Sequence, residues 1–193
     1  MVHRTTGRAQ IHPTGAKFLL SLLTTITLVF LRPFPATTET VFGPPLSIQE
    51  LTRRAKIVII GTVADIGSEW DKSKSVIMTR VQVLAEESLK GLTQPVDRVE
   101  FFQLGGKVGE ITSVVGGAPF YREGERLLLF LTRHEDGTLR VIGQFQGKFD
   151  VELDPVSGAE MALRRLPGSD KVFDRMPLDQ ARSEVLKVRG QEG

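Results

Sequence analysis

Short apolar runs, several of them with a period of two, are separated by turn-forming residues along most of the chain, which is typical of β-strands. The run Lys56–Ile66 is β-branched and too short for a helix. It predicts a strand that is buried on both faces at its start and broken or bulged at Gly61, followed by a loop at 67–73. Residues 75–86 alternate with interruptions, which indicates a strand with partial burial of its outer face. Further strands are expected at 98–103, 110–115, 126–131, 138–144, 148–153 and 160–163.

A helix is expected at each end of this strand-rich region. Ser47 and Glu50 match a capping box, in which each residue satisfies a backbone amide of the other, so a helix is expected from Ser47 to about Ala55. A second helix is expected at 178–188, because its apolar residues recur at near-helical spacing. These residues are Leu178, Ala181, Val185 and Val188.

The order of these elements predicts a mainly β fold. We expect an antiparallel OB-like barrel or small sandwich of roughly six to eight strands, with a short helix before the first strand and a helix at the C-terminus. Residues 47–193 are expected to form this single domain, with 37–46 as a linker.

Residues 1–36 have the pattern of a signal peptide. They contain four basic residues and no carboxylate, and within them an apolar run covers 18–31. This run has the length of the apolar part of a signal peptide, whereas a bilayer-spanning helix needs about 20 residues. The basic residues are Arg4, Arg8, Lys17 and Arg32.

The cleavage pattern is only half met, since Ala36 can end the leader but Phe34 stands where a small residue is expected. An uncleaved N-terminal anchor is therefore the alternative, and the membrane would then be contacted through residues 18–31 alone. Under both interpretations the folded part is exported, to the periplasm or to the extracellular space.

The leader also accounts for the positive charge of the chain. The formal net charge is +2, with 25 basic and 23 acidic residues. Four of the basic residues belong to the leader, which leaves 21 basic against 23 acidic residues in 37–193. Nucleic-acid binding depends on a basic surface, so no nucleic-acid partner is expected.

Cysteine and histidine are too scarce for several kinds of active site. The chain has no cysteine, which excludes disulfides and thiolate chemistry. Beyond the leader the one histidine is His134, at an expected hairpin tip, so neither a Ser-His-Asp triad nor a multi-histidine metal site is expected. Chemistry that needs only carboxylates stays open. The carboxylates considered are Asp65, Glu69, Asp71, Glu110, Asp150 and Asp154.

Glycines and two single aromatic residues are the candidates for a binding site. The glycine-rich stretch can bring backbone amides to an anion, although it lacks the Lys-Ser/Thr of a phosphate loop, and an exposed aromatic side chain can anchor a partner. Turn formation and ordinary packing are the alternatives. The candidates are Trp70, Gly105, Gly106, Gly109, Gly116, Gly117 and Tyr121.

Seven blocks of the sequence resemble a broad family of uncharacterised secreted bacterial proteins, and this resemblance implies no settled activity. The blocks are Ala55–Val63, Val83–Gly91, Gly105–Gly109, Gly117–Phe120, Gly124–Phe130, Gln146–Phe149 and Pro177–Asp179.

A more distant resemblance covers about half of the domain. The strand around Gly61, the strand that ends at Gly91 and the strand after Gly124 are similar to the OB-type barrel of netrin-like modules and tissue inhibitors of metalloproteinases. The resemblance implies a protein-binding or inhibitory module. Those inhibitors bind the zinc of their target through an N-terminal cysteine, which this chain lacks, so that route is excluded.

The expected function is that of an exported binding module without catalysis, cofactor or metal, whose ligand is a protein or a cell-envelope component. The alternative is a carboxylate-dependent hydrolase acting on envelope glycans, which needs two carboxyl groups about 5–10 Å apart, one of them with a raised pKa. A structural envelope component is a third possibility.

Overall fold

The computed structural model describes residues 44–92 and 98–191, all of which belong to one compact unit, Phe42–Gly193. The signal segment expected at 1–36 and most of the expected linker lie outside the described residues. No helix within the described ranges is both long and apolar enough to cross a membrane.

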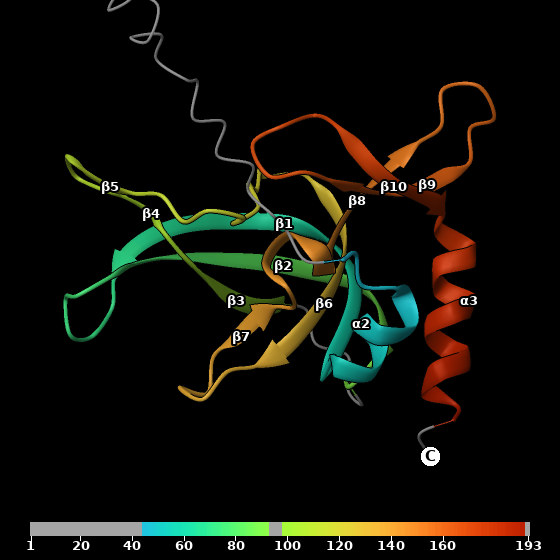
Figure 1. The fold of residues 1–193 in the computed structure, drawn as a ribbon, viewed down its shortest axis with the longest axis horizontal. Coiled ribbons are helices and arrows are strands. Elements are labelled where there is room, and N and C mark those ends of the chain that lie inside the picture. The colour runs from blue at the N-terminus through green and yellow to red at the C-terminus, as the bar shows by residue number, and fades with distance from the viewer. Residues whose placement is uncertain (1–43, 93–97, 192–193) are drawn as a thin grey trace, which may run out of the picture. The chain divides into compact units, whose positions relative to one another are not determined.

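The described residues form a mainly β, antiparallel fold with a helix before the first strand and another at the C-terminus, as the sequence predicts (Figure 1). The two helices are α2 (Ile48–Arg54) and α3 (Leu178–Arg189). The strands are β1 (Ile57–Trp70), β2 (Ile77–Lys90), β3 (Arg98–Leu104), β4 (Gly106–Val108), β5 (Ile111–Ser113), β6 (Arg126–Arg133), β7 (Leu139–Val141), β8 (Lys148–Leu153), β9 (Glu160–Arg165) and β10 (Val172–Pro177), with a short 3-10 helix η1 (Gln144–Gly147) between β7 and β8.

Eight strands make one curled sheet in the order β10-β9-β8-β6-β1-β2-β3, with β7 also paired to β6. Figure 1 shows the long strands β1 and β2 as a curved pair, and their register extends to Trp70 opposite Ile77. The curl brings β3 into contact with β7, although these two strands are not neighbours in the described sheet. The sheet is therefore a half-barrel, while β4 and β5 form a separate two-stranded ribbon.

The core lies on both faces of the central strands β1 and β6. Ile59 and Leu129 point into the curl, toward Phe101 of β3. Val58 and Phe130 point to the other face, which packs against α2 and α3. Residues 57–61 are all buried, which confirms the prediction of a strand with two buried faces at its start.

Local sequence signals explain the ends of several elements. The capping box of α2 is present, since the Glu50 amide donates to Ser47 Oγ at 3.2 Å and the Ser47 amide donates to the Glu50 carboxylate at 2.8 Å. The pairing of β1 with β2 shifts register between Ile60 and Gly61, so the predicted bulge is confirmed.

Several elements differ from the predictions. Strand β1 continues through Trp70 where a loop is expected, because the Asp71 carboxylate accepts the amides of Ser75 (2.6 Å) and Val76 (2.9 Å) and closes a tight hairpin. The strand expected at 138–144 ends at Val141, where Gly143 takes a positive φ and starts η1. Strands β4 and β10 have no prediction, since neither has a clear period-two pattern.

Arg164 of β9 is a fully buried arginine with 1% exposure. Its guanidinium carbon lies 4.6 Å from the Phe149 ring centroid and 5.2 Å from that of Phe173, the spacing of cation–π contacts. Its Nη1 donates to the carbonyl oxygens of Leu46 (2.8 Å) and Gln146 (3.3 Å).

The same guanidinium forms an ion pair with Asp174 of β10, while its Nε has no partner among the described residues. Arg164 thereby connects the residue before the α2 cap, the η1 turn and the edge strand of the sheet.

Replacing Arg164 by alanine should lower the free energy of unfolding by about 3–5 kcal/mol, because Asp174 and two carbonyl groups lose their partner inside the protein. Arg175→Ala is the matched control, since its ion pair with Asp154 is half-exposed and should contribute about 0–1 kcal/mol. Denaturant unfolding measures both, and equal small losses in the two variants would contradict the role of Arg164.

Gly61→Ala should destabilise the fold by about 1–3 kcal/mol, because a β-carbon at Gly61 would lie 2.2 Å from the Leu84 carbonyl oxygen. Gly116→Ala is the control, as its β-carbon would enter open space, and its effect should stay within about 0.5 kcal/mol. Thermal or urea unfolding measures the stability of both variants. An equal loss for Gly61→Ala and Gly116→Ala would contradict the prediction, because it would mean that β1 and β2 can move apart at Gly61 without cost.

Candidate functional site

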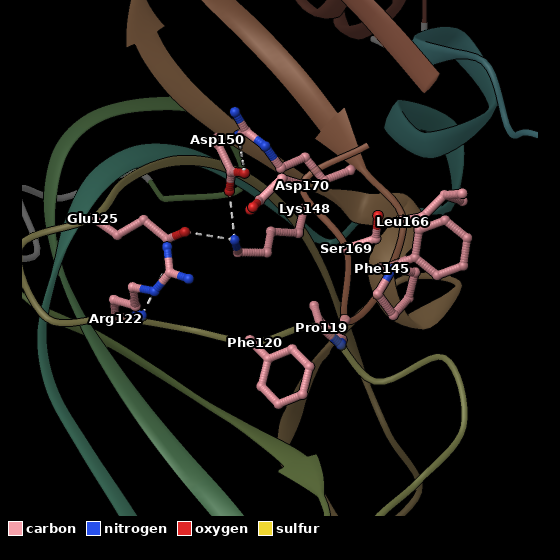
Figure 2. A pocket seen from close by; sticks show the side chains of 13 residues that line it. Pro119, Phe120, Arg122, Glu125, Phe145, Lys148, Asp150, Leu166, Ser169 and Asp170 are labelled. Carbon is pink, nitrogen blue, oxygen red and sulfur yellow. Dashed lines mark hydrogen bonds and ion pairs between the residues drawn. The ribbon is translucent and has the colours of Figure 1, made fainter. Parts of the chain in front are cut away.

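A pocket of about 360 Å³ lies between the segment before β6, the start of β8 and the turn after β9 (Figure 2). Both charged and apolar side chains line it. The lining residues are Pro119, Phe120, Arg122, Glu125, Phe145, Lys148, Asp150, Arg165, Leu166, Pro167, Gly168, Ser169 and Asp170.

Lys148 lies at the centre of the charged wall and is only 9% exposed. Its ammonium group donates to Glu125 Oε1 at 2.8 Å and to Asp150 Oδ1 at 2.5 Å, as Figure 2 shows. Lys148 and Asp150 are two residues apart in β8, so the strand's period of two places them on the same face. Arg165 of β9 completes the cluster, since its Nη1 donates to Asp150 Oδ2 at 2.6 Å.

The electrostatics of this cluster keep Asp150 ionised. Burial alone would raise the pKa of Asp150, but the ammonium of Lys148 and the guanidinium of Arg165 outweigh burial, and the pKa is lowered.

Tyr121 packs beneath the lysine, with its ring centroid 5.4 Å from Lys148 Nζ and 5.3 Å from the Phe101 ring. Its hydroxyl group is buried and makes no hydrogen bond with any described residue. Burial raises the pKa of this hydroxyl well above its usual value, and the negative charges of Glu125 and Asp150 add to the effect. Tyr121 is therefore neutral at physiological pH.

The opposite wall of the pocket is apolar. Phe120 is 69% exposed although it is a large apolar side chain, and its ring lies close to Gly168 of the turn after β9. Phe145 is buried and packs against Phe173 with a centroid distance of 5.8 Å. Figure 2 shows the Phe120 ring on the side of the pocket across from the Lys148 cluster.

The two carboxylates at Lys148 satisfy only one of the requirements for glycoside hydrolysis. Both carboxylates bind Lys148 Nζ, at 2.8 and 2.5 Å. Their bound oxygens are therefore close enough for a retaining enzyme, which needs a separation of about 5–5.5 Å between its two carboxyl groups. The ammonium of Lys148, however, lies between them, and the pKa of Asp150 is lowered rather than raised, which opposes the role of a general acid.

Of the binding candidates proposed from the sequence, Tyr121 is the one that the structure places beside this cluster. Asp150, which the sequence offered as a candidate carboxylate, belongs to the cluster itself. It also lines a second, smaller hollow of about 200 Å³. Gln144 lines the same hollow and, with its amide nitrogen turned toward them, donates to the carbonyl oxygens of Gly116 (3.1 Å) and Gly117 (3.2 Å).

The other candidates lie elsewhere. Trp70 ends β1, and Gly109 is in the turn between β4 and β5. Gly105 accepts a hydrogen bond from Thr79 Oγ1 through its carbonyl oxygen at 2.7 Å. A β-carbon at Gly106 would lie 2.4 Å from Ser68 Oγ, so close packing of the ribbon on β1 explains this glycine.

Sequence reasoning missed four of the residues that matter most for the pocket: Phe120, Glu125, Lys148 and Arg165. The available signal was the pattern Lys148-Phe149-Asp150. It places two opposite charges on one face of a strand, with the apolar side chain of Phe149 on the other face. Among the described residues, no group of three or more His, Asp or Glu side chains is placed to hold a metal ion.

Comparison with known proteins adds no relative to this picture. A scan of the chain against models of protein families gives no match, and a search of curated proteins gives none either. The resemblances derived from the sequence blocks therefore stay predictions.

Asp150→Asn should make stability less dependent on pH in the acid range. Because the pKa of Asp150 is lower in the folded than in the unfolded state, its ion pairs stabilise the fold above about pH 4 and are lost as the pH falls through the lower folded value. Urea unfolding at pH 7 and at steps down to about pH 2 measures this, with a shallower acid loss expected for Asp150→Asn. The exposed control Asp170→Asn should keep the wild-type dependence of the free energy of unfolding on pH. The same dependence in the wild type and in both variants would contradict the prediction.

Proposed function

We propose that this protein is an exported binding module that holds its ligand in the pocket around Lys148 and performs no reaction on it. The observation that carries the proposal is the combination of a charged wall, whose side chains are held in mutual ion pairs, with the exposed Phe120 ring across the pocket.

Rigidity of the charged wall supports binding. Lys148, Asp150 and Arg165 project from neighbouring strands of the sheet, and each is oriented by another member of the cluster. Such a wall is organised before a ligand arrives, so little conformational entropy is lost on binding. The exposed Phe120 ring at the rim then supplies apolar surface from which water is displaced when a ligand binds.

Export is part of the proposal because of residues 1–36, whose basic start and apolar run match a signal peptide. The ligand would accordingly be a protein or an envelope component outside the cytoplasm.

The hydrolase is the weaker candidate. One specific observation favours it, namely two carboxylates on one lysine in an open pocket. The lowered pKa of Asp150 argues against it, since neither proton donation nor a free nucleophile fits a carboxylate that is bound to both Lys148 and Arg165.

The binding test uses isotope-labelled protein and NMR titration with two pools, one of short peptides and one of soluble oligosaccharides. We expect at least one pool to shift amide resonances of 119–125, 148–150 and 166–170 in a saturable way, with no product formed during prolonged incubation. Phe120→Ala should weaken that response, whereas Val156→Ala, which removes a 94% exposed valine in the turn between β8 and β9, should not.

Two results would contradict the proposal. The first is the absence of a saturable shift at these residues with every pool. The second is turnover of an oligosaccharide that is abolished by Glu125→Gln or Asp150→Asn while the protein stays folded.

A further inference from the structure

We propose that the pocket around Lys148 recognises a neutral, hydroxyl-rich ligand, namely a short segment of an uncharged saccharide chain. This inference rests on the proposed binding function and names its ligand class.

The balance of charge in the pocket is the first argument. Three cationic side chains and three carboxylates line it. Three ion pairs join four of these six groups to one another, so the field of each is largely cancelled by its neighbour. An anionic or a cationic ligand would meet as many like charges as opposite ones and would gain little Coulomb energy. The six residues are Arg122, Lys148, Arg165, Glu125, Asp150 and Asp170.

Both a hydrogen-bond donor and a hydrogen-bond acceptor of the pocket stay unused by the described residues once these ion pairs have formed. An ammonium group has three N–H donors, and Lys148 uses two of them on Glu125 and Asp150. Within residues 44–92 and 98–191 its third donor has no hydrogen-bond acceptor and the Asp170 carboxylate has no hydrogen-bond or ion-pair partner. A hydroxyl group both donates and accepts, so a ring that carries several hydroxyls can satisfy such a wall from one position.

The apolar wall fits the other side of a sugar ring. The face of an aromatic ring is electron-rich and attracts weakly positive C–H groups, and a pyranose presents several of these on one face. Phe120 offers such a face because its ring is largely exposed at the rim.

A peptide that adds a strand fits less well. The turn after β9 uses its own backbone groups, since the Leu166 amide donates to the Lys171 carbonyl and the Ser169 amide donates to the Leu166 carbonyl, both at 3.1 Å. The lining turn therefore offers no open strand edge for backbone pairing. The volume of about 360 Å³ is near the lower end for small-ligand sites, which suits a short segment of a chain.

The experiment compares three probes of similar size in NMR titrations of the full chain. The probes are a neutral oligosaccharide series (maltotriose, cellotriose and chitotriose), the anionic trisaccharide trigalacturonate, and an acetylated, amidated peptide rich in aromatic residues. We expect a member of the neutral series to shift the resonances of 119–125, 148–150 and 166–170.

Two controls define the mode of binding. Phe120→Ala should weaken binding about 3- to 10-fold, the size expected for one aromatic contact, while Val156→Ala should leave the affinity unchanged. Raising the salt from about 50 to about 500 mM should change the affinity of a neutral ligand less than twofold, because no net charge is screened.

Each contrary outcome has its own meaning. If the peptide or trigalacturonate binds at these residues and the neutral series does not, the saccharide inference is overturned while the binding function stands. If none of the probes shifts these residues, and the larger pools of the preceding test do not either, the binding function fails together with the inference. Binding of the neutral series that Phe120→Ala leaves unchanged would place the site elsewhere and would also overturn the inference.

Discussion

The buried guanidinium of Arg164 is the constraint on which the arrangement of the pocket depends. It has to be paired inside the protein, because an isolated charge in an apolar core is prohibitively costly. Its partners are the Leu46 and Gln146 carbonyl oxygens and Asp174, with the rings of Phe149 and Phe173 on its faces. Gln146 belongs to the turn that carries Phe145, and Asp174 follows the turn after β9, so one side chain positions two walls of the pocket.

The next residue along β9, Arg165, serves the opposite face of the sheet. Successive side chains of a strand point to opposite sides, so Arg164 enters the helix-covered core and Arg165 reaches Asp150 in the pocket. Strand β8 repeats this division, with Phe149 in the core and Lys148 with Asp150 in the pocket. The stability of the domain and the chemistry of its candidate site are therefore built on the same two strands.

Local sequence signals predicted the elements whose ends are decided by neighbouring residues. The capping box of Ser47 and Glu50, the spacing of apolar residues in 178–188 and the bulge at Gly61 all depend on contacts within or next to the element. Strand β10 is different, because its position depends on β9 and on the ion pair between Arg164 and Asp174. Its sequence has no period of two that could show this.

The sequence by itself determined the mainly β class and the two terminal helices, since β-branched runs, turn residues and caps act over a few positions. It also determined that thiol and multi-histidine chemistry are absent from residues 37–193, because these depend on composition alone. Only the tertiary structure decided the site. Glu125 and Lys148 are 23 residues apart, and Arg165 and Asp150 are 15 apart; they meet because β8 pairs with β6 and β9 in a specific register. Such pairing follows from how the whole core packs, which no short stretch of the chain encodes.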